Sequence, residues 1–502
     1  MTTTFDGPQC DVIIVGAGPT GLTLARLLTM KDVRVAVVDP NRIACPHPRA
    51  AHIDDETMRV FQTVGAADFE PHFLRAGGWS LRGEDGTEFL STSMPRGETG
   101  QGWNADYMFH QPDLESRLRG LLAVSDHADL WLGWQVTAVD QDDTHASVRM
   151  LDRTTGRTTT LRARYVVGAD GAGSLVREQV QSEVEDLHGT QSSVIIDIHP
   201  FAHPAELSRT ESFVLFGGDR PAIYVPMFPP KLRFEFLLRD NEEGTEFEDP
   251  VTVYRLLSPW LAPDSYRIQR TDVYTWHARL VRGWRNGRLL IAGDAAHLMP
   301  PMLGQGMCSG LRDVTNLAWK LARVVHDRSG PELLDTYEAE RSPHVRPFIE
   351  ESARQSNTIK AFAIPENRPR GVPPQVVERM RPPLGASLSD PAPPGAGLLA
   401  PQPRTGDGTL LDDVVGYNFA VVARPEVLAE VSDRVRAAWS ALDAAVVALP
   451  GRQFADWLQE HDADAAIVRP DRYTYALTHG SAALEAASLA LAERLAAEGA
   501  MV

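Results

Sequence analysis

Short apolar runs alternate with stretches of helical periodicity at two places in the chain. Residues 11–15 and 33–38 are apolar runs typical of strands buried on both faces, and Leu22, Ala25 and Leu28 between them recur at helical spacing. Residues 289–291 form another apolar run, which is followed by hydrophobic positions at helical spacing: Leu311, Val314, Leu317, Leu321 and Val324. The order of strand, loop and helix predicts an α/β architecture at both places.

The region between these two α/β units has the pattern of a sheet. Four runs in it are rich in β-branched and aromatic residues and are bounded by glycine, proline or aspartate: 193–198, 212–216, 222–225 and 232–238. We therefore expect an antiparallel sheet inserted between two parts of a nucleotide-binding domain.

The pattern breaks before the C-terminal part of the chain. Residues 365–394 contain nine prolines, too many for a helix or an inner strand, and predict a linker with few contacts across it. Beyond it, apolar runs at 419–422, 444–449 and 465–468 predict buried strands, and the alanine-rich residues 481–497 predict a helix. Strands and helix in alternation indicate a second, small α/β domain.

The loop after the first apolar run carries a dinucleotide-binding fingerprint, Gly16-Ala-Gly18-Pro19-Thr-Gly21. Gly16 permits a tight turn, Gly18 lets the backbone approach a pyrophosphate, and Gly21 lets helix and strand pack closely. Asp39, at the end of the second run, can accept a hydrogen bond from a ribose hydroxyl. Together these residues predict a site for the adenosine diphosphate half of a nucleotide.

The block at residues 293–310 indicates which nucleotide is bound. Asp294 stands at a strand end, where its carboxylate can accept hydrogen bonds from polyol hydroxyls. The loop that follows contains Gly304-Gln305-Gly306 and leads into a helix, whose first N–H groups and positive dipole favour a group that becomes anionic. A reduced flavin ring fits this description.

A third turn rich in glycine and aspartate, at residues 165–174, follows another apolar run. Alone, it is better explained as an ordinary turn in which Asp170 bonds to the backbone. The order and spacing of the three segments together resemble the class A flavoprotein monooxygenases, the para-hydroxybenzoate hydroxylase type. Residues 300–310, Pro-Pro-Met-Leu-Gly-Gln-Gly-Met-Cys-Ser-Gly, look most like the 3-(3-hydroxyphenyl)propionate hydroxylase branch. The resemblance covers nearly the whole chain.

The resemblance implies which residues bind FAD. It places the fingerprint loop at the pyrophosphate and Asp39 at the adenosine ribose, where the family usually carries glutamate. Asp294, after Gly293, would bind the ribityl chain. The other positions that match cofactor contacts in relatives are Arg49, Gln111, Asp170 and, around the isoalloxazine ring, Pro301, Gly304, Gln305, Gly306, Met307 and Cys308. His297 is better explained by packing under the loop than by catalysis.

The resemblance also implies a fold class, α/β, with defined domains. These are a Rossmann-like FAD-binding domain in two parts (1–185 and 276–364), an inserted antiparallel-sheet substrate domain (186–275), a proline-rich linker (365–396) and a thioredoxin-like C-terminal domain (397–502). The inserted sheet would roof a substrate pocket above the flavin edge. Five aromatic residues are candidates to line this pocket, with core packing as the alternative for each: Trp79, Phe216, Tyr224, Phe234 and Phe236.

The implied reaction is hydroxylation of a phenol or another aromatic ring. FAD takes hydride from NAD(P)H, O2 adds to the reduced flavin, and the resulting C4a-hydroperoxide transfers oxygen to the ring. The protein holds the ring near the flavin, excludes water and favours the phenolate. The sequence does not identify a general base.

Several alternatives to this reaction remain open at the level of sequence. One is a tailoring monooxygenase that acts on a polyketide or another antibiotic intermediate, and another is a non-oxygenating flavin oxidoreductase of the same fold. A halogenase would carry a Trp-x-Trp-x-Ile-Pro segment, which this chain lacks. A protein that retains FAD only as a structural group is the alternative from a different class.

Composition and charge exclude some classes of binding partner and indicate the cellular compartment. A formal net charge of −18 disfavours nucleic acid and anionic membranes, because both require a basic face. No apolar run approaches the length of a membrane span, and the N-terminus lacks the features of a signal peptide. We expect a cytoplasmic protein that acts on a small aromatic molecule.

The cysteines and histidines suggest no metal site and no disulfide. Cys10, Cys45 and Cys308 are too few and too scattered, and His47 and His52 lack the spacing and companions of metal ligands. No cysteine follows Cys308, so the C-terminal domain cannot perform dithiol chemistry. Packing and subunit contact, in a homodimer, remain as its expected roles.

Overall fold

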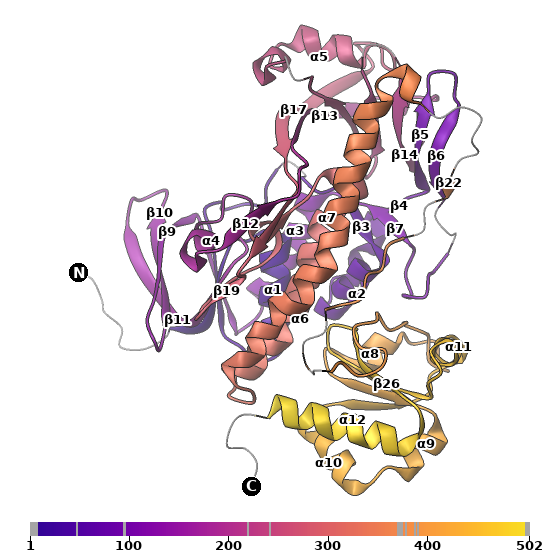
Figure 1. Ribbon diagram of the computed structural model, residues 1–502. Coiled ribbons are helices and arrows are strands. Elements are labelled where there is room, and N and C mark those ends of the chain that lie inside the picture. Colours follow the sequence, from indigo (N-terminus) through magenta and orange to yellow (C-terminus); the bar gives the residue numbers. More distant parts are fainter. Residues whose placement is uncertain are drawn as a thin grey trace.

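The computed structural model describes residues 9–46, 49–93, 97–217, 220–239, 242–368, 375–376, 379–385, 388 and 391–496. An eight-stranded sheet carries the glycine-rich loops (Figure 1). Its central strands are parallel, in the order β20 (Leu289–Ile291), β11 (Thr158–Gly168), β1 (Cys10–Val15), β2 (Val35–Asp39) and β8 (Ala128–Leu132). Antiparallel pairing adds β19 (Arg285–Asn286), β10 (Ala146–Asp152) and β9 (Trp134–Gln141).

The register of the parallel strands aligns their carboxyl ends. Val15 of β1 lies opposite Val38 of β2 and Gly168 of β11, and Gly168 lies opposite Ile291 of β20. The loops that follow these strands therefore begin at one edge of the sheet, which is where open α/β sheets bind their ligands.

Long helices pack against this sheet and bury the hydrophobic positions that the sequence pattern identified. α1 (Pro19–Thr29) and α6 (Gly306–Val325) contact each other, and all five positions predicted for the second helical pattern are buried in α6. The other helices of this part are α2 (Asp55–Val64), α3 (Gln111–Ala123), α4 (Leu175–Val180) and α7 (Thr336–Phe362). Helix α7 is the long orange helix in Figure 1 and runs from the second sheet at the top of the view down past the first sheet. No helix in the described ranges is both long and apolar enough to cross a membrane.

A second sheet of eight strands lies beside the end of α7 that is farthest from the C-terminal part (Figure 1). Its strand order is β17 (Tyr266–Trp276), β13 (Gln191–Pro200), β16 (Leu232–Leu237), β15 (Ala222–Pro226), β14 (Glu211–Phe216), β5 (Gly78–Gly83), β6 (Glu88–Ser93) and β22 (Gln375–Val376). The four predicted runs form β13 to β16. The sequence pattern missed β5 and β6, which come from the part of the chain before residue 186. α5 (Pro250–Leu257) contributes to the apolar cluster of this sheet.

Two small three-stranded sheets complete the body. One consists of β12 (Glu183–Asp186), β18 (Arg279–Arg282) and β21 (His297–Leu298), and the other of β3 (His52–Asp54), β7 (Asp106–Met108) and β4 (Leu74–Arg75). The second of these pairs residues 52–54 with 106–108 in antiparallel register. It thereby brings two acidic segments of the chain together.

The C-terminal part folds around a four-stranded sheet in the order β24 (Ala445–Ala448), β23 (Ala420–Ala423), β25 (Ala465–Val468) and β26 (Thr474–Thr478). The pairing of β23 with β24 is parallel and the other two pairings are antiparallel. Its helices are α8 (Leu411–Val415), α9 (Pro425–Glu430), α10 (Asp433–Ala441), α11 (Arg452–Glu460) and α12 (Gly480–Leu495). The three predicted strands and the predicted helix are all present, although residue 497 lies outside the described residues.

The C-terminal part is tightly joined to the body rather than tethered by a linker. The hydroxyl of Tyr417 donates to the carbonyl of Thr315 at 2.6 Å, and the rings of Trp319 and Phe419 meet edge to face. The expectation of few contacts across the proline-rich stretch is also wrong, because Arg379 of that stretch forms ion pairs with the body. Periodicity could not reveal these contacts because the partners are 100 or more residues apart.

Buried ion pairs strengthen this junction. Glu340 on α7 accepts from the ammonium of Lys320 at 2.7 Å and from the guanidinium of Arg469 at 2.6 Å. Burial alone would raise the pKa of Glu340, but the charges of Arg469 and Lys320 outweigh it and lower the pKa well below its usual range. The carboxylate is therefore ionised and balances two buried cations.

We expect Glu340→Ala to lower the free energy of unfolding by about 3–5 kcal/mol, because it leaves the buried Lys320 without its counterion and takes one of two carboxylate partners from Arg469, which keeps Asp471. The matched control is Glu350→Ala on the same helix, whose exposed pair with Arg346 has a nitrogen to oxygen distance of 3.4 Å and contributes about 0.5 kcal/mol or less. Denaturant unfolding followed by circular dichroism measures both. Equal losses in the two variants would contradict the role assigned to Glu340.

Candidate active site

A cavity of 1440 Å³ is lined on one side by the loops after β1, β2, β11 and β20 and on the other by β13, β14, β15 and β16. It exceeds the roughly 300–1,000 Å³ of a pocket for one small ligand. The cavity therefore has room for a cofactor and a substrate together.

The fingerprint loop lines this cavity. Gly16 has a φ of +107°, and a Cβ there would lie 2.3 Å from the carbonyl oxygen of Ala169. A Cβ on Gly21 would lie 2.0 Å from the carbonyl oxygen of Gly16, whereas Gly18 has nothing within 4 Å of its Cβ position. Gly18 is also the N-cap of α1, without a side-chain cap, and Pro19 follows it. Open space above an uncapped helix start fits a pyrophosphate.

Two further predicted cofactor residues are fixed by hydrogen bonds at the cavity wall. Asp39 accepts from the N–H of Ala17 at 2.8 Å and from the N–H of Asn41 at 2.7 Å. The side-chain oxygen of Gln111 accepts from the N–H of Arg49 at 3.0 Å and from that of the next residue at 2.8 Å. Asp39, Gln111 and Arg49 all line the cavity.

Asp294 lines the cavity without a hydrogen-bond partner among the described residues. Burial raises the pKa of its carboxyl group, and a buried polar group that lacks a partner is costly unless a ligand satisfies it. Gly293, with a φ of +62°, turns the chain beneath it and donates its N–H to Asp313 at 3.1 Å. Asp294 therefore fits a ligand hydroxyl, as expected of the ribityl chain of FAD.

The loop predicted to border the isoalloxazine ring lies at the cavity, except for its last residue. The lining residues are Pro301, Gly304, Gln305, Gly306 and Met307. The Cys308 side chain is buried behind them. α6 begins at Gly306 without a side-chain cap, so its first N–H groups have no partner within the helix and can face an anionic group.

Two other predicted residues have structural partners. Asp170 lines the cavity, but its carboxylate accepts from the hydroxyl of Ser174 at 2.5 Å and from the N–H of Leu175 at 2.8 Å, at the start of α4. His297 is fully buried, with its Nε2 2.6 Å from Asp313, and it does not line the cavity. His297 therefore supports the loop from below.

Only one of the five aromatic candidates for the substrate pocket lines the cavity, and that is Trp79. Tyr224, Phe234 and Phe236 belong to the apolar cluster on the opposite face of the second sheet, and Phe216 belongs to another cluster. The prediction chose the wrong face of β16. Because side chains alternate along a strand, the residues that face the cavity are Arg233 and Glu235.

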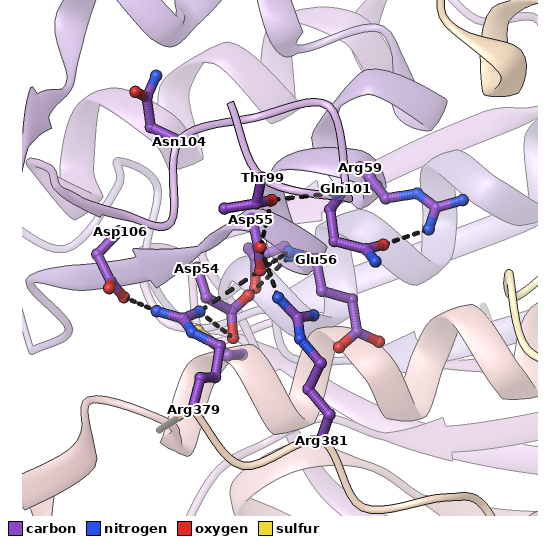
Figure 2. Close-up of polar contacts among 12 residues, drawn as sticks. Asp54, Asp55, Glu56, Arg59, Thr99, Gln101, Asn104, Asp106, Arg379 and Arg381 are labelled. Carbon is purple, nitrogen blue, oxygen red and sulfur yellow. Dashed lines mark hydrogen bonds and ion pairs between the residues drawn. The ribbon is translucent and has the colours of Figure 1, made fainter. Parts of the chain in front are cut away.

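A cluster of acidic and basic side chains closes the cavity on the side of β3 and β7. Figure 2 shows the guanidinium groups of Arg379 and Arg381 pointing toward Asp54, Asp55 and Asp106. Arg379 forms ion pairs with all three carboxylates, and Arg381 pairs with Asp55 at 2.6 Å. Residues 379–381, which we call the arginine strap, line the cavity. Carboxylates from the start of the chain thus fix a segment of the proline-rich stretch over the site.

His52 connects this cluster to the flavin-ring loop. Its Nε2 is hydrogen-bonded to the carboxylate of Asp106, and its Nδ1 lies 3.2 Å from the carbonyl oxygen of Gly304. Both partners only accept hydrogen bonds, so both ring nitrogens must carry a proton. Burial alone would lower the pKa of His52, but Asp106 outweighs it and raises the pKa to about 10. A cationic imidazolium therefore lies at the cavity wall.

Sequence reasoning missed the relationship among His52, Asp106 and the arginine strap. The sequence offers His52 only as a candidate metal ligand, and within the described ranges no group of three or more such side chains is placed to hold a metal ion. The one local signal was the acidic Asp54-Asp55-Glu56, which reads as a helix start, and Asp54 does cap α2. The two arginines of the strap lie more than 300 positions away from Asp55, where no local pattern points to them.

Glycine-rich loops and an unpartnered carboxyl at one sheet edge, facing a roofed cavity, define a nucleotide-binding oxidoreductase of the flavoprotein class. The FAD binding domain family matches residues 9–352, and the HcaD C-terminal domain family matches residues 397–494. The chain belongs to the first of these families, within the FAD-dependent aromatic monooxygenases.

Its similar relatives are hydroxylases. A 3-(3-hydroxy-phenyl)propionate/3-hydroxycinnamic acid hydroxylase of Mycolicibacterium smegmatis is 34% identical over 91% of this chain and 85% of the relative. A probable NADH-specific resorcinol 4-hydroxylase of Rhodococcus jostii is 33% identical over 94% of this chain and 93% of the relative. Each match therefore extends over most of this chain and most of the relative.

Solved structures share the fold. The flavin-dependent monooxygenase PieE, in complex with FAD and substrate, has a TM-score of 0.78 at 21% identity and covers 97% of this chain and 100% of its own. Aklavinone-11 hydroxylase, with FAD and aklavinone, has a TM-score of 0.77 at 23% identity over the same shares of the two chains. At this identity the similarity establishes the architecture alone.

We expect Asp294→Ala to weaken FAD binding by roughly 10- to 100-fold while the chain stays folded, because a charge-assisted hydrogen bond contributes about 1.5–3 kcal/mol. Asp294→Asn keeps a hydrogen-bond acceptor and should lose less FAD affinity than Asp294→Ala. Gly18→Val should lose more FAD affinity, because its side chain enters the pyrophosphate space. Titration of the apoprotein with FAD, followed by flavin fluorescence, measures all three. Unchanged affinity in Asp294→Ala would show that the ribityl chain binds elsewhere.

The stabilising contribution of His52 should depend on pH. Because its pKa is raised from 6.5 to about 10, the stability that it contributes is fully present below about pH 6.5 and is lost as the pH rises toward 10. The difference in unfolding free energy between wild type and His52→Gln should therefore shrink over this range. His479→Gln, which removes a 77% exposed histidine 3.5 Å from Asp464, is the control and should show little change. A constant difference for His52→Gln from pH 6 to 9.5 would contradict the cationic assignment.

Proposed function

We propose that this chain is a single-component hydroxylase that uses FAD, NAD(P)H and O2 to add a hydroxyl group to a phenolic ring. The observation that carries the proposal is a single cavity with two chemically distinct sides. One side offers helix N-termini and the unpartnered Asp294, which suit FAD, and the other offers the inner face of the second sheet, which suits a flat ring.

The residues present fit FAD along its whole length. Gly18 and the start of α1 would bind the pyrophosphate, Asp39 the ribose, Asp294 the ribityl chain, and the start of α6 the ring. When bound and reduced by NAD(P)H, the flavin activates O2 for transfer of one oxygen atom to the substrate. All other contributions in this proposal come from side chains of the chain itself.

The first contribution is electrostatic. The cationic His52 lines the cavity, and a cation near the ring favours the phenolate over the neutral phenol. A phenolate is more electron-rich and therefore more reactive toward an electrophilic oxygen. The proton on His52 stays in place because Asp106 stabilises it.

The second contribution is the exclusion of water. The arginine strap lines the cavity and is fixed by the buried carboxylates of Asp55 and Asp106 on the side of β3 and β7. A closed site protects the activated oxygen from wasteful release as peroxide. The ion pair between Arg379 and Asp106 also connects the strap to His52, so that closure and phenolate stabilisation depend on the same carboxylate.

The relatives favour a simple phenol over a larger substrate. Those that are 33–34% identical act, by name, on hydroxyphenylpropionate, hydroxycinnamate or resorcinol. The tailoring alternative has no support in these relatives, and the solved structures, which include a rebeccamycin biosynthetic enzyme at 22% identity, share the fold alone. A non-oxygenating oxidoreductase is not favoured, because the relatives that match 91–94% of this chain are named hydroxylases.

The finer organisation remains part of this proposal. The second sheet would form most of a substrate domain at residues 186–275 between FAD-binding parts 1–185 and 276–364, and residues 365–396 would connect to a thioredoxin-like domain at 397–502. The protein would act in the cytoplasm, with no nucleic acid or membrane partner, and would form a homodimer. Size-exclusion chromatography with light scattering tests the last of these expectations.

The decisive experiment measures NAD(P)H oxidation with a panel of phenols and quantifies hydroxylated product and peroxide in parallel. We expect a phenol to accelerate NAD(P)H oxidation at least tenfold and to yield nearly one product per NAD(P)H. The FAD-depleted protein is the control. Peroxide in place of product would indicate an oxidase, and no stimulation by any phenol would favour a structural role for FAD.

A further inference from the structure

The cavity face of the second sheet contains one carboxyl group set among aliphatic side chains. Glu235 on β16 stands between Ile195 of β13 and Ile223 of β15 in the strand register. All three line the cavity, as does Val214 of β14, which lies opposite Ile223. The immediate neighbours of Glu235 on this face are therefore aliphatic, although Ser212, Tyr274 and Thr275 of the same sheet also line the cavity.

Glu235 has no hydrogen-bond donor among the described residues. Its exposed fraction is 7%, and burial raises the pKa of its carboxyl group, an effect that the charge of Arg233 opposes. Arg233 does not bond to it, because its guanidinium binds the carboxylate of Asp197 in a bidentate manner at 2.7 and 3.0 Å. A buried carboxyl that faces a cavity and has no partner in the protein is suited to a partner in the ligand.

The arginines at the cavity are already neutralised, with the exception of Arg49 beside the predicted FAD site. Their carboxylate partners are Asp197 for Arg233, Asp272 for Arg270, Glu351 for Arg354, Asp106 for Arg379 and Asp55 for Arg381. Within the described lining, the substrate space thus lacks a free buried cation for an anionic side chain. The substrate space presents the carboxyl group of Glu235 instead.

We propose that Glu235 determines substrate specificity by hydrogen bonding to a ring hydroxyl, and that the preferred substrate is an uncharged aromatic ring with two hydroxyl groups. This inference rests on the proposed function. One hydroxyl is the group that ionises near His52, and the other meets Glu235, since a hydroxyl can both donate to and accept from a carboxyl group. A carboxylate side chain on the substrate would bring a second acid to the same apolar site, which is unfavourable. The site should therefore favour a resorcinol-like ring over a hydroxyphenylpropionate.

The test compares resorcinol, phenol and 3-(3-hydroxyphenyl)propionate in steady-state NAD(P)H oxidation and in flavin difference-spectrum titrations of the FAD-loaded enzyme. We expect wild type to bind resorcinol most tightly. Glu235→Leu should raise KM and Kd for resorcinol about 10- to 100-fold and change those for phenol less than about threefold, because a site built to pair a hydroxyl discriminates through that pair. Glu235→Gln retains hydrogen bonding, so its KM and Kd for resorcinol should lie between those of wild type and those of Glu235→Leu.

The matched control is Glu246→Gln, which changes an exposed glutamate outside the cavity and should leave all constants unchanged. Glu235→Leu replaces an unpartnered buried carboxyl with an apolar group of similar size, so the variant should fold at least as stably as wild type. Unfolding curves check this point, and Glu235→Gln provides a second folded variant.

Two results would overturn the inference, and they are distinguishable from failure of the proposed function. If wild type turns over resorcinol and Glu235→Leu shows the same KM and Kd, Glu235 does not contact the substrate. If wild type prefers 3-(3-hydroxyphenyl)propionate by tenfold or more, the charge argument is wrong. If the folded, FAD-loaded wild type hydroxylates none of the three rings, the proposed function fails and this inference fails with it.

Discussion

The parallel register of β20, β11, β1 and β2 is the constraint on which the site depends. Hydrogen bonding along these strands brings Val15, Gly168 and Ile291 to the same level, so that loops separated by more than a hundred residues begin at one edge. Each loop then contributes one simple element: an open glycine, a carboxylate or an uncapped helix. None of these elements would recognise a flavin alone. Their convergence is a property of the sheet, and a slip of one strand would separate them.

The sequence predicted the parts of this arrangement that depend on local patterns. Buried strands such as β1 and helices such as α6 have periodicities of their own, and the fingerprint glycines occupy the positions that their geometry requires. The pocket aromatics were misplaced for a physical reason. β16 is buried on both faces, so apolar character alone does not tell which face meets the cavity and which meets the core. The polar residues of the strand, Arg233 and Glu235, marked the functional face.

What sequence could not supply are the contacts between distant charges. The proline-rich stretch suggested a free connector because its composition excludes regular structure, yet Arg379 is paired with carboxylates of β3, α2 and β7. Irregular backbone can still be rigidly fixed when its side chains reach buried counterions. The same principle explains why the cavity, despite many arginines, offers little free positive charge. Charge counting along the chain therefore misjudges the electrostatics of the site, and only the pairing of the groups in space reveals it.

α6 is a single helix of 20 residues, about 30 Å long, and its two halves have different partners. Its first turn faces the cavity, whereas Asn316 and Trp319, farther along, reach Asp471 of the C-terminal part. Occupancy of the flavin site and docking of the C-terminal part therefore act on the same element. Where a bound flavin stabilises this helix and so favours docking, thermodynamic reciprocity requires that docking favour flavin binding to the same extent. Loss of the cofactor would loosen the C-terminal part as well as the empty site, so cellular proteases would encounter a more accessible chain and could clear the empty enzyme selectively.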